Sequence, residues 1–316
     1  MYRFILAVGL VLVVAMPSLG ADIEKGMAAY TRGDFKEALE ELKPLAEQNN
    51  QEAQLTLGNM YYDGEGVDQS DAEALKWYTK AAEQGSAEAQ TELGGMYSDG
   101  KGVSQDYAEA AKWYRKAADQ GLPEAQYELG SMFYDGHGVT KDAEEAAKWY
   151  RKAAEQELAE AQSALGGMYI GGDGVNQDYA EAAKWLRKAA DQGLAQAQFE
   201  LGNMYYEGHG VEQDYEEAAD WYREAAEQGS AEAQFEMGNL YSDGQGVAQD
   251  PVEAAKWYQK AADQGLAEAQ YELGNLYADG EGVAQDGAEA EKWYRKAAEQ
   301  GNEEAKERLD ELSKGQ

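Results

Sequence analysis

The amino-acid sequence predicts an all-α solenoid of seven helix–turn–helix repeats of 36 residues, with N- and C-terminal capping helices. The first observation is a fixed period, the second is helical spacing in both halves of each copy, and the third is glycine at each turn. All seven tryptophans follow one another at intervals of 36 residues: Trp77, Trp113, Trp149, Trp185, Trp221, Trp257 and Trp293.

The first half of each copy predicts a helix. In the copy that begins at Gln51, Ala53, Leu57, Met60 and Tyr61 stand at i, i+4, i+7 and i+8, which places them on one helical face. The sequence Asp-Gly-x-Gly-Val then follows, and two glycines one residue apart end the helix and permit positive φ.

The second half predicts another helix. Ala110, Trp113, Ala117 and Ala118 lie on one face, and Gly121 is suited to the left-handed position after the last turn. Residues that favour an N-cap stand before these helices: Ser70, Asp106, Asp142, Asp178, Asp214, Asp250 and Asp286.

Glycine also recurs inside the first helix of every copy, where it costs about 1 kcal/mol relative to alanine. The positions are Gly58, Gly94, Gly130, Gly166, Gly202, Gly238 and Gly274. We therefore expect the partner helix to approach too closely for a Cβ atom. In one copy Glu157 replaces the glycine that ends the second helix, so we expect that turn to be strained or differently closed.

The repeated string Ala-x-Ala-Gln-x-x-Leu-Gly-x-x-Tyr-x-x-Gly-x-Gly-Val…Ala-x-x-Trp-x-x-x-Ala-Ala-x-x-Gly resembles the Sel-1-like repeat family, a relative of the tetratricopeptide repeat. The resemblance covers residues 51–302, with departures at Phe133, Gly171 and Met237. It implies a right-handed superhelical α-solenoid whose first helices line a concave face. It also implies scaffold or adaptor work through protein–protein contact.

The two ends of the array predict caps. Residues 22–50 form a degenerate hairpin that resembles a tetratricopeptide repeat, with helices at Ile23–Thr31 and Phe35–Gln48. Residues 303–316 predict a C-terminal capping helix, frayed at its end, whose apolar stripe is Ala305, Leu309 and Leu312. Since the chain has only 4 prolines and no flexible linker, we expect one continuous array without an internal boundary.

Residues 1–20 predict a secretory signal peptide. Arg3 precedes the apolar run Phe4–Met16, which is short for a membrane span, and cleavage is expected after Gly20 or Ala21. We expect a periplasmic or secreted protein of a Gram-negative bacterium, monomeric and without a stable membrane span after cleavage. An uncleaved anchor is the alternative interpretation.

The net charge of the chain limits the kinds of partner that it can bind. The chain has 27 basic and 61 acidic residues, a formal net charge of −34, which disfavours nucleic acid as a partner. The acidity indicates either a basic partner or a surface that only keeps the protein soluble. No disulfide or thiolate site is possible because the chain has no cysteine.

No pattern indicates catalysis, a cofactor or a metal. The only histidines, His137 and His209, lie two repeats apart, and a metal site needs three or four ligands that converge. The Asp-Gly-x-Gly-Val loops follow a helix and lack the lysine of a phosphate loop and the alternating carboxylates of a calcium loop. We therefore expect a non-enzymatic scaffold. The alternatives are an exported hydrolase of β-lactam or peptidoglycan type and a secreted factor that engages a host protein.

The variable face of the first helices is the predicted binding groove. It varies between copies while the inward-facing rows barely change, and its aromatic and amide side chains could anchor a bound segment. The candidate residues are Tyr127, Tyr134, Phe199, Asn203, Tyr206, Phe235, Asn239, Tyr271 and Asn275. The alternative is that these aromatic side chains only pack against a neighbouring helix.

Overall fold

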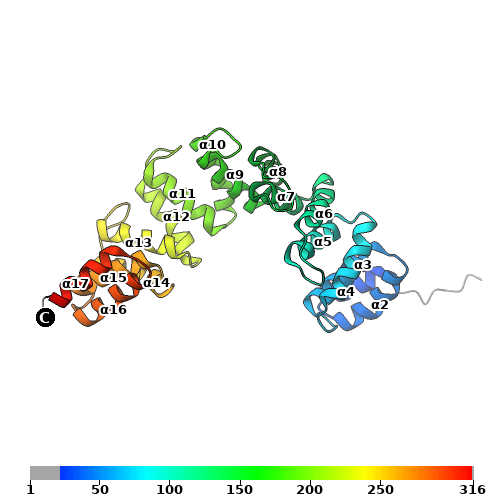
Figure 1. Cartoon of the computed structure of the whole chain (residues 1–316), viewed down its shortest axis with the longest axis horizontal. Helices are drawn as coiled ribbons and strands as arrows, with labels where there is room; N and C mark the ends of the chain where they lie inside the picture. The colour runs from blue at the N-terminus through cyan, green and yellow to red at the C-terminus, as the bar shows by residue number, and fades with distance from the viewer. Residues whose placement is uncertain (1–21, 315–316) are drawn as a thin grey trace, which may run out of the picture. The chain divides into compact units, whose positions relative to one another are not determined.

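The computed structural model describes residues 22–314, which form seventeen helices and no strand (Figure 1). The terminal hairpin and the C-terminal helix are α1 (Ile23–Thr31), α2 (Phe35–Glu47) and α17 (Glu303–Lys314). The first helices of the seven copies are α3 (Gln51–Asp63), α5 (Ala87–Asp99), α7 (Pro123–Asp135), α9 (Ala159–Gly171), α11 (Ala195–Glu207), α13 (Ala231–Asp243) and α15 (Ala267–Asp279). The second helices are α4 (Asp71–Glu83), α6 (Tyr107–Asp119), α8 (Ala143–Glu155), α10 (Tyr179–Asp191), α12 (Tyr215–Glu227), α14 (Pro251–Asp263) and α16 (Gly287–Glu299). The predicted all-α repeat fold is confirmed.

The chain divides into two compact units, Met1–Gln120 and Gly121–Gln316. We expected one array without an internal boundary, and the division falls where α6 ends and before α7 begins. Each repeat of a solenoid contacts only its neighbours, so a linear array can be divided between two copies without cutting a shared core. Within each unit, every second helix packs against the first helix of its own copy and that of the next copy.

Contact between a mid-helix glycine and a tyrosine of the second helix closes six of the seven repeat hairpins. A Cβ atom built at Gly202 would lie 2.6 Å from Cδ1 of Tyr222, and one at Gly238 would lie 2.5 Å from Cδ1 of Tyr258. In one copy Leu186 replaces the tyrosine, and a Cβ atom built at Gly166 would lie 2.7 Å from Cγ of Leu186. The structure therefore confirms that the mid-helix glycines allow the second helix to approach.

Within each unit, the second glycine of a loop packs against the backbone of the preceding copy. A Cβ at Gly210 would lie 2.2 Å from the carbonyl carbon and oxygen of Tyr179, the first residue of α10. Gly246 stands in the same relation to Tyr215 of α12, at 2.0 Å from its carbonyl oxygen. Both glycines also have positive φ, 72° and 67°. Loop and helix backbones are therefore in direct contact at each of these junctions.

The turn at Glu157 closes in the same way as the turns that contain glycine. Its φ is 68°, one of two positive values at non-glycine residues in the described chain. Glu157 N–H donates to Ala154 at 3.1 Å and Leu158 N–H donates to Ala153 at 3.3 Å, which matches the bonds around Gly193 and Leu194. Of the two expected outcomes, strain is the one observed, because a left-handed conformation is unfavourable for a residue with a Cβ.

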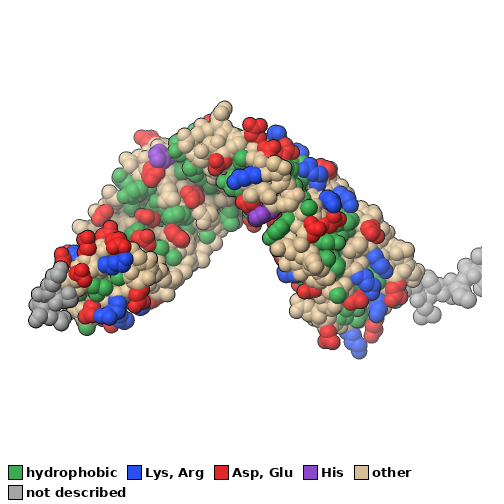
Figure 2. All heavy atoms as spheres, viewed as in Figure 1, with side chains coloured by type: hydrophobic (Ala, Val, Ile, Leu, Met, Phe, Trp, Pro, Cys, Tyr) green, Lys and Arg blue, Asp and Glu red, His purple; other side chains and the backbone are tan. Residues whose placement is uncertain are grey.

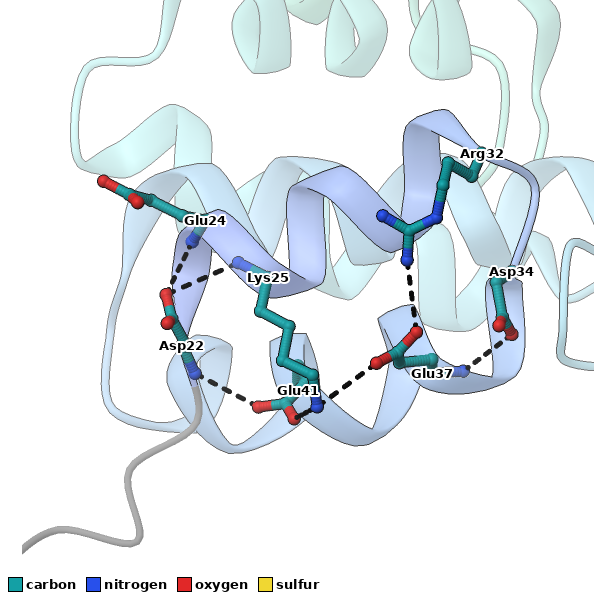
Figure 3. A network of polar contacts seen from close by, with 7 residues as sticks. All are labelled: Asp22, Glu24, Lys25, Arg32, Asp34, Glu37 and Glu41. Atoms are coloured by element: carbon teal, nitrogen blue, oxygen red, sulfur yellow. Dashed lines mark hydrogen bonds and ion pairs between the residues drawn. The ribbon is translucent and has the colours of Figure 1, made fainter.

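Polar contacts hold the N-terminal hairpin together (Figure 3). The Asp22 carboxylate accepts from the backbone at the start of α1, which caps the helix. Lys25 of α1 pairs with Glu37 at 3.2 Å and Glu41 at 2.6 Å, both on α2, and Arg32 pairs with Glu37 at 3.3 Å. These exposed pairs add little stability individually, while the apolar contact of α1 and α2 with α3 forms the core at this end.

Ala305 of α17 is buried, and Leu309 and Leu312 pack against the last hairpin, as the apolar stripe indicated. The predicted signal peptide at residues 1–20 lies outside the described residues. No helix in the described part of the chain has both the length and the apolar character needed to cross a membrane.

Candidate functional site

The first helices differ from the second helices in charge. Each of the seven first helices contains between one and three carboxylates and neither lysine nor arginine. Six of the second helices carry two lysines in equivalent positions: Lys76 and Lys80, Lys112 and Lys116, Lys148 and Lys152, Lys184 and Lys188, Lys256 and Lys260, and Lys292 and Lys296. On the face of the molecule drawn in Figure 2, acidic and basic side chains are interspersed. The first helices themselves therefore carry only negative charge, although loop lysines approach them: Lys141 lies over the Tyr134 ring at 5.5 Å, and Lys101 donates to the Tyr62 hydroxyl.

The aromatic row of the first helices packs on the tyrosines that close the hairpins. The ring centroids of Phe199 and Tyr222 are 5.8 Å apart, and those of Phe235 and Tyr258 are 5.7 Å apart. Tyr127 on Tyr150 and Tyr271 on Tyr294 repeat this contact at 5.5 and 5.9 Å. Each of the four row residues remains half-buried. These aromatic groups thus contact the second helix of their own copy and still expose part of their surface.

The asparagine row bonds to the same tyrosines. The amide oxygen of Asn203 accepts from the Tyr222 hydroxyl at 2.7 Å, that of Asn239 from Tyr258 at 2.7 Å, and that of Asn275 from Tyr294 at 2.8 Å. In an earlier copy Ser131 accepts from the Tyr150 hydroxyl at 3.0 Å instead. The amide oxygens that we expected to grip a peptide backbone are therefore engaged within the hairpin.

Two carboxylates beside these asparagines were absent from the sequence-based candidates. Asn239 donates to Glu236 at 3.0 Å, and Asn275 donates to Glu272 at 3.1 Å. Burial raises the pKa of the Glu236 carboxyl, although the Asn239 hydrogen bond acts in the opposite direction. The signal was present in the sequence, since a glutamate follows the aromatic residue and precedes the asparagine by three positions in both copies.

Tyr134 and Tyr206 lie at the end of their first helices and contact the loop of the next copy. The Tyr134 hydroxyl donates to Asp173 at 3.3 Å, and the Tyr206 hydroxyl donates to Gln245 at 3.0 Å. The nearby charge of Asp173 is the largest cause that raises the pKa of Tyr134. These two candidates therefore join adjacent copies, and they remain half-buried.

The described residues contain no group of three or more histidine, aspartate or glutamate side chains placed to hold a metal ion. His209 Nδ1 lies 2.7 Å from a Glu207 carboxylate oxygen, and its ring stacks on Tyr179 at 4.8 Å. Both contacts are local to the junction between two copies.

The hairpins, their fixed period and their copy-to-copy packing define an α-solenoid built from helical hairpins. The Sel1 repeat family model matches residues 51–86, 87–122, 123–158, 159–194, 195–230, 231–266 and 267–302, so the chain belongs to the Sel1 repeat family. Sel1 repeats generally mediate protein–protein interaction.

Two solved structures are similar along most of this chain. The c5321 protein, described as a protective antigen present in uropathogenic Escherichia coli strains, is 41% identical with a TM-score of 0.85, covering 92% of this chain and 63% of that protein. A Sel1 repeat protein from Oxalobacter formigenes is 39% identical with a TM-score of 0.72, covering 92% of this chain and 88% of the other.

A curated relative from Rhizobium leguminosarum bv. viciae is named as an exopolysaccharide production negative regulator. It is 42% identical over 55 residues, which is 17% of this chain and 21% of the relative. The chain therefore spans less than two thirds of the E. coli protein and about a fifth of this regulator.

Proposed function

We propose that this chain is an exported, non-enzymatic scaffold that binds a protein or peptide segment in a groove lined by its first helices. The observation that carries the proposal is the surface of α11, α13 and α15, where half-buried aromatic rings lie beside carboxylates on helices that contain no basic residue. The general role of Sel1 repeats in protein–protein interaction supports it.

The aromatic side chains are suited to anchor the bound segment. Phe199, Phe235 and Tyr271 are already braced by the tyrosine of the partner helix, so binding would immobilise little additional side-chain motion. In this proposal the asparagines do not grip the segment directly. Asn239 and Asn275 instead hold Glu236 and Glu272 in place, and these carboxylates would receive the donors of the partner.

The preferred partner is a basic segment. An anionic face attracts cationic residues, and contact with the aromatic rings would add specificity. The sequence left open whether the acidity acts only in solubility. The absence of lysine and arginine from the first helices supports recognition, because solubility alone does not require basic residues to be confined to the other segments of each copy.

Export is supported by the signal-peptide pattern at residues 1–20. The similar E. coli protein is described as a protective antigen, which agrees with a protein accessible to antibodies. Mass spectrometry of protein purified from periplasmic and culture fractions should show a chain that begins at Ala21 or Asp22. Recovery mainly from the culture supernatant would favour the secreted, host-directed alternative, and an intact Met1 in the membrane fraction would contradict cleavage.

Affinity capture from envelope extract tests the groove. The bait variant is Glu200→Gln, Glu236→Gln, Glu272→Gln, which keeps the side-chain shape and an oxygen for the asparagine bonds. The matched control is Glu155→Gln, Glu227→Gln, Glu299→Gln, which makes the same change in charge at exposed positions of second helices. We expect a specific partner to be retained by the native bait and the control, and to be reduced at least about tenfold with the groove variant, a difference of about 1.4 kcal/mol.

Equal capture by all three baits would show that the first-helix face is not the binding surface. An equal loss with both variants would show that bulk charge, rather than the groove, governs binding. Capture of the same partner that persists after a moderate increase in salt would indicate contact in the groove. Capture that is lost with added salt would indicate long-range attraction to the acidic surface.

A further inference from the structure

A recess on α14 has surface chemistry opposite to that of the first helices. Its volume is about 440 Å³, and it lies between α14 and the next copy. Val252, Lys256 and Lys260 line it from α14, and Leu273 and Val283 line it from α15 and the loop that follows. We call this the α14 recess.

The α14 recess has an uncommon residue at the start of its helix. Pro251 stands at the first position of the helix, where α6, α10 and α12 have a tyrosine. On α10 that tyrosine, Tyr179, stacks on His209 of the next loop at 4.8 Å. Proline suits the first helical position but supplies no such ring. The adjacent Val252 is 51% exposed, and it is the one large hydrophobic residue found exposed among residues 22–312.

The rim of the α14 recess is cationic. Its lining contains Lys256 and Lys260 and no carboxylate. Lys256 pairs with Glu253 at 2.5 Å, outside the lining. The Lys260 amine lies 3.6 Å from the centre of the Trp257 ring, and no described carboxylate forms an ion pair with it. The tryptophan holds this amine beside the apolar floor, where it can receive an anion.

An equivalent recess lies two copies earlier, on α10. It has a volume of about 550 Å³ and is lined by Lys184, Arg187 and Lys188, together with the carboxylates Glu181 and Asp191. Lys188 lies over Trp185 at 4.2 Å, as Lys260 lies over Trp257.

The copy between these recesses has the opposite charge at the same positions. On α12, Asp220 and Glu224 replace the two lysines, and Arg187 of the previous copy lies over Trp221 in their place at 5.2 Å. The chain itself therefore shows which substitutions the helix accepts at the lysine positions.

We propose that the α14 recess, with the α10 recess as a second and weaker instance, binds an acidic segment of a partner protein through an apolar side chain flanked by carboxylates. The apolar side chain fills the floor formed by Val252, Leu273 and Val283, and the carboxylates meet Lys256 and Lys260. A small inorganic anion would leave the floor unfilled, and a basic segment would meet two lysines.

The net charge of −34 repels acidic chains at long range. Binding is therefore restricted to the places where lysines and an apolar floor act together. This site does not depend on the first-helix groove, and the two together give the scaffold one surface for a basic partner and another for an acidic one.

The test uses the full mature chain and a fluorescein-labelled peptide, Glu-Asp-Leu-Phe-Asp-Glu, followed by fluorescence anisotropy at physiological salt. The main variant is Lys256→Asp, Lys260→Glu, which introduces the residues that α12 carries naturally. A second variant, Val252→Glu, uses the residue that α8 and α12 have at this exposed position. Circular dichroism and thermal unfolding verify that each variant keeps its helices.

We expect saturable binding to the native chain and a dissociation constant raised at least about tenfold in both variants. A peptide with serine in place of leucine and phenylalanine should bind with a similar loss. The groove variant Glu200→Gln, Glu236→Gln, Glu272→Gln should bind the peptide as the native chain does. Absence of saturable binding of the acidic peptide, or an affinity in both recess variants equal to that of the native chain, would overturn the proposal.

Discussion

Gly166 and Gly167 are neighbours on α9, and their surroundings are opposite. A Cβ at Gly166 would lie 2.7 Å from Leu186 of the partner helix, whereas a Cβ at Gly167 would meet nothing within 4 Å. The position of Gly166 is glycine in every copy, whereas the position of Gly167 is asparagine, glycine or serine. On α9, therefore, one position closes the hairpin, and the next, whose counterparts bond to a tyrosine hydroxyl in other copies, has no such partner because Leu186 replaces the tyrosine.

We expect the largest effect at high pH, where the tyrosines that pack against the mid-helix glycines ionise and the fold loses stability. Burial raises the pKa of Tyr150 and Tyr294 to about 12 and that of Tyr78, Tyr222 and Tyr258 further. A raised pKa means that the folded state favours the neutral phenol. The free energy of unfolding is therefore at its full value below the unfolded pKa of about 10, and it declines as the pH rises above that pKa. Because a tenfold change in an ionisation equilibrium corresponds to about 1.4 kcal/mol, ionisation of these tyrosines at high pH lowers the free energy of unfolding by on the order of several kcal/mol in total.

We therefore expect the buried tyrosines to ionise and the helical circular dichroism signal to fall over the same pH range, above a pH of about 10. Absorbance of the phenolate follows the first change. Complete titration of all tyrosines with the helices retained would contradict the role assigned to burial.

The next largest effect is expected at the junction between copies. Gly210→Ala adds a Cβ against the backbone of Tyr179 at 2.2 Å in a residue with positive φ. The expected loss is about 2–5 kcal/mol, which combines the left-handed strain with overpacking. Gly193→Ala is the control, because its φ is also positive and nothing lies within 4 Å of the added Cβ. Chemical denaturation should show a smaller loss for the control; equal losses would mean that the junction adds nothing beyond strain.

The two adjacent glycines of α9 provide a direct test of the comparison. Gly166→Ala should destabilise by about 1–3 kcal/mol through overpacking against Leu186. Gly167→Ala should stabilise by up to about 1 kcal/mol, because alanine favours the helix and the added methyl meets no neighbour. Thermal unfolding of both variants measures the difference. Effects of the same sign would remove the distinction between the two surfaces.

The smallest expected effect concerns the turn at Glu157. Glu157→Gly should stabilise by about 0.5–1 kcal/mol, since relief of the left-handed strain exceeds the additional chain entropy of glycine. Glu157→Ala keeps the Cβ and removes the charge, so it should leave stability nearly unchanged. A gain of the same size in both variants would assign the effect to charge instead of backbone conformation.

Much of the fold could be predicted because the same pattern of residues occurs seven times in the sequence. The 36-residue period and the glycine pairs indicated hairpins whose helices begin and end close to the predicted residues. The glycine at position 202 and its equivalents even indicated a close contact, but spacing alone could not identify Tyr222 as the group above it. That identification depends on which residue of the second helix faces the glycine, a question of register between two helices.

The candidate site was less accessible to sequence reasoning. Helical spacing placed Phe235 and Asn239 on one face, but it could not show that Tyr258 engages both of them. It also passed over Glu236, because acids are common in this chain and none is marked as special before its neighbours are known. The α14 recess was missed because it is formed by α14, α15 and the loop after α15 together, and spacing along one helix does not show which residues of neighbouring elements enclose a space.

The backbone contact between each loop and the preceding helix restricts how such a chain can change its length. Gly210 fits against Tyr179, and Gly246 fits against Tyr215, because each loop comes one full copy after the helix that it covers. Removal or duplication of 36 residues preserves every such fit, while any other length would place a residue with a side chain against a carbonyl group. A gene of this kind can therefore gain or lose whole copies by recombination, and new combinations of surface residues arise without a new junction having to evolve.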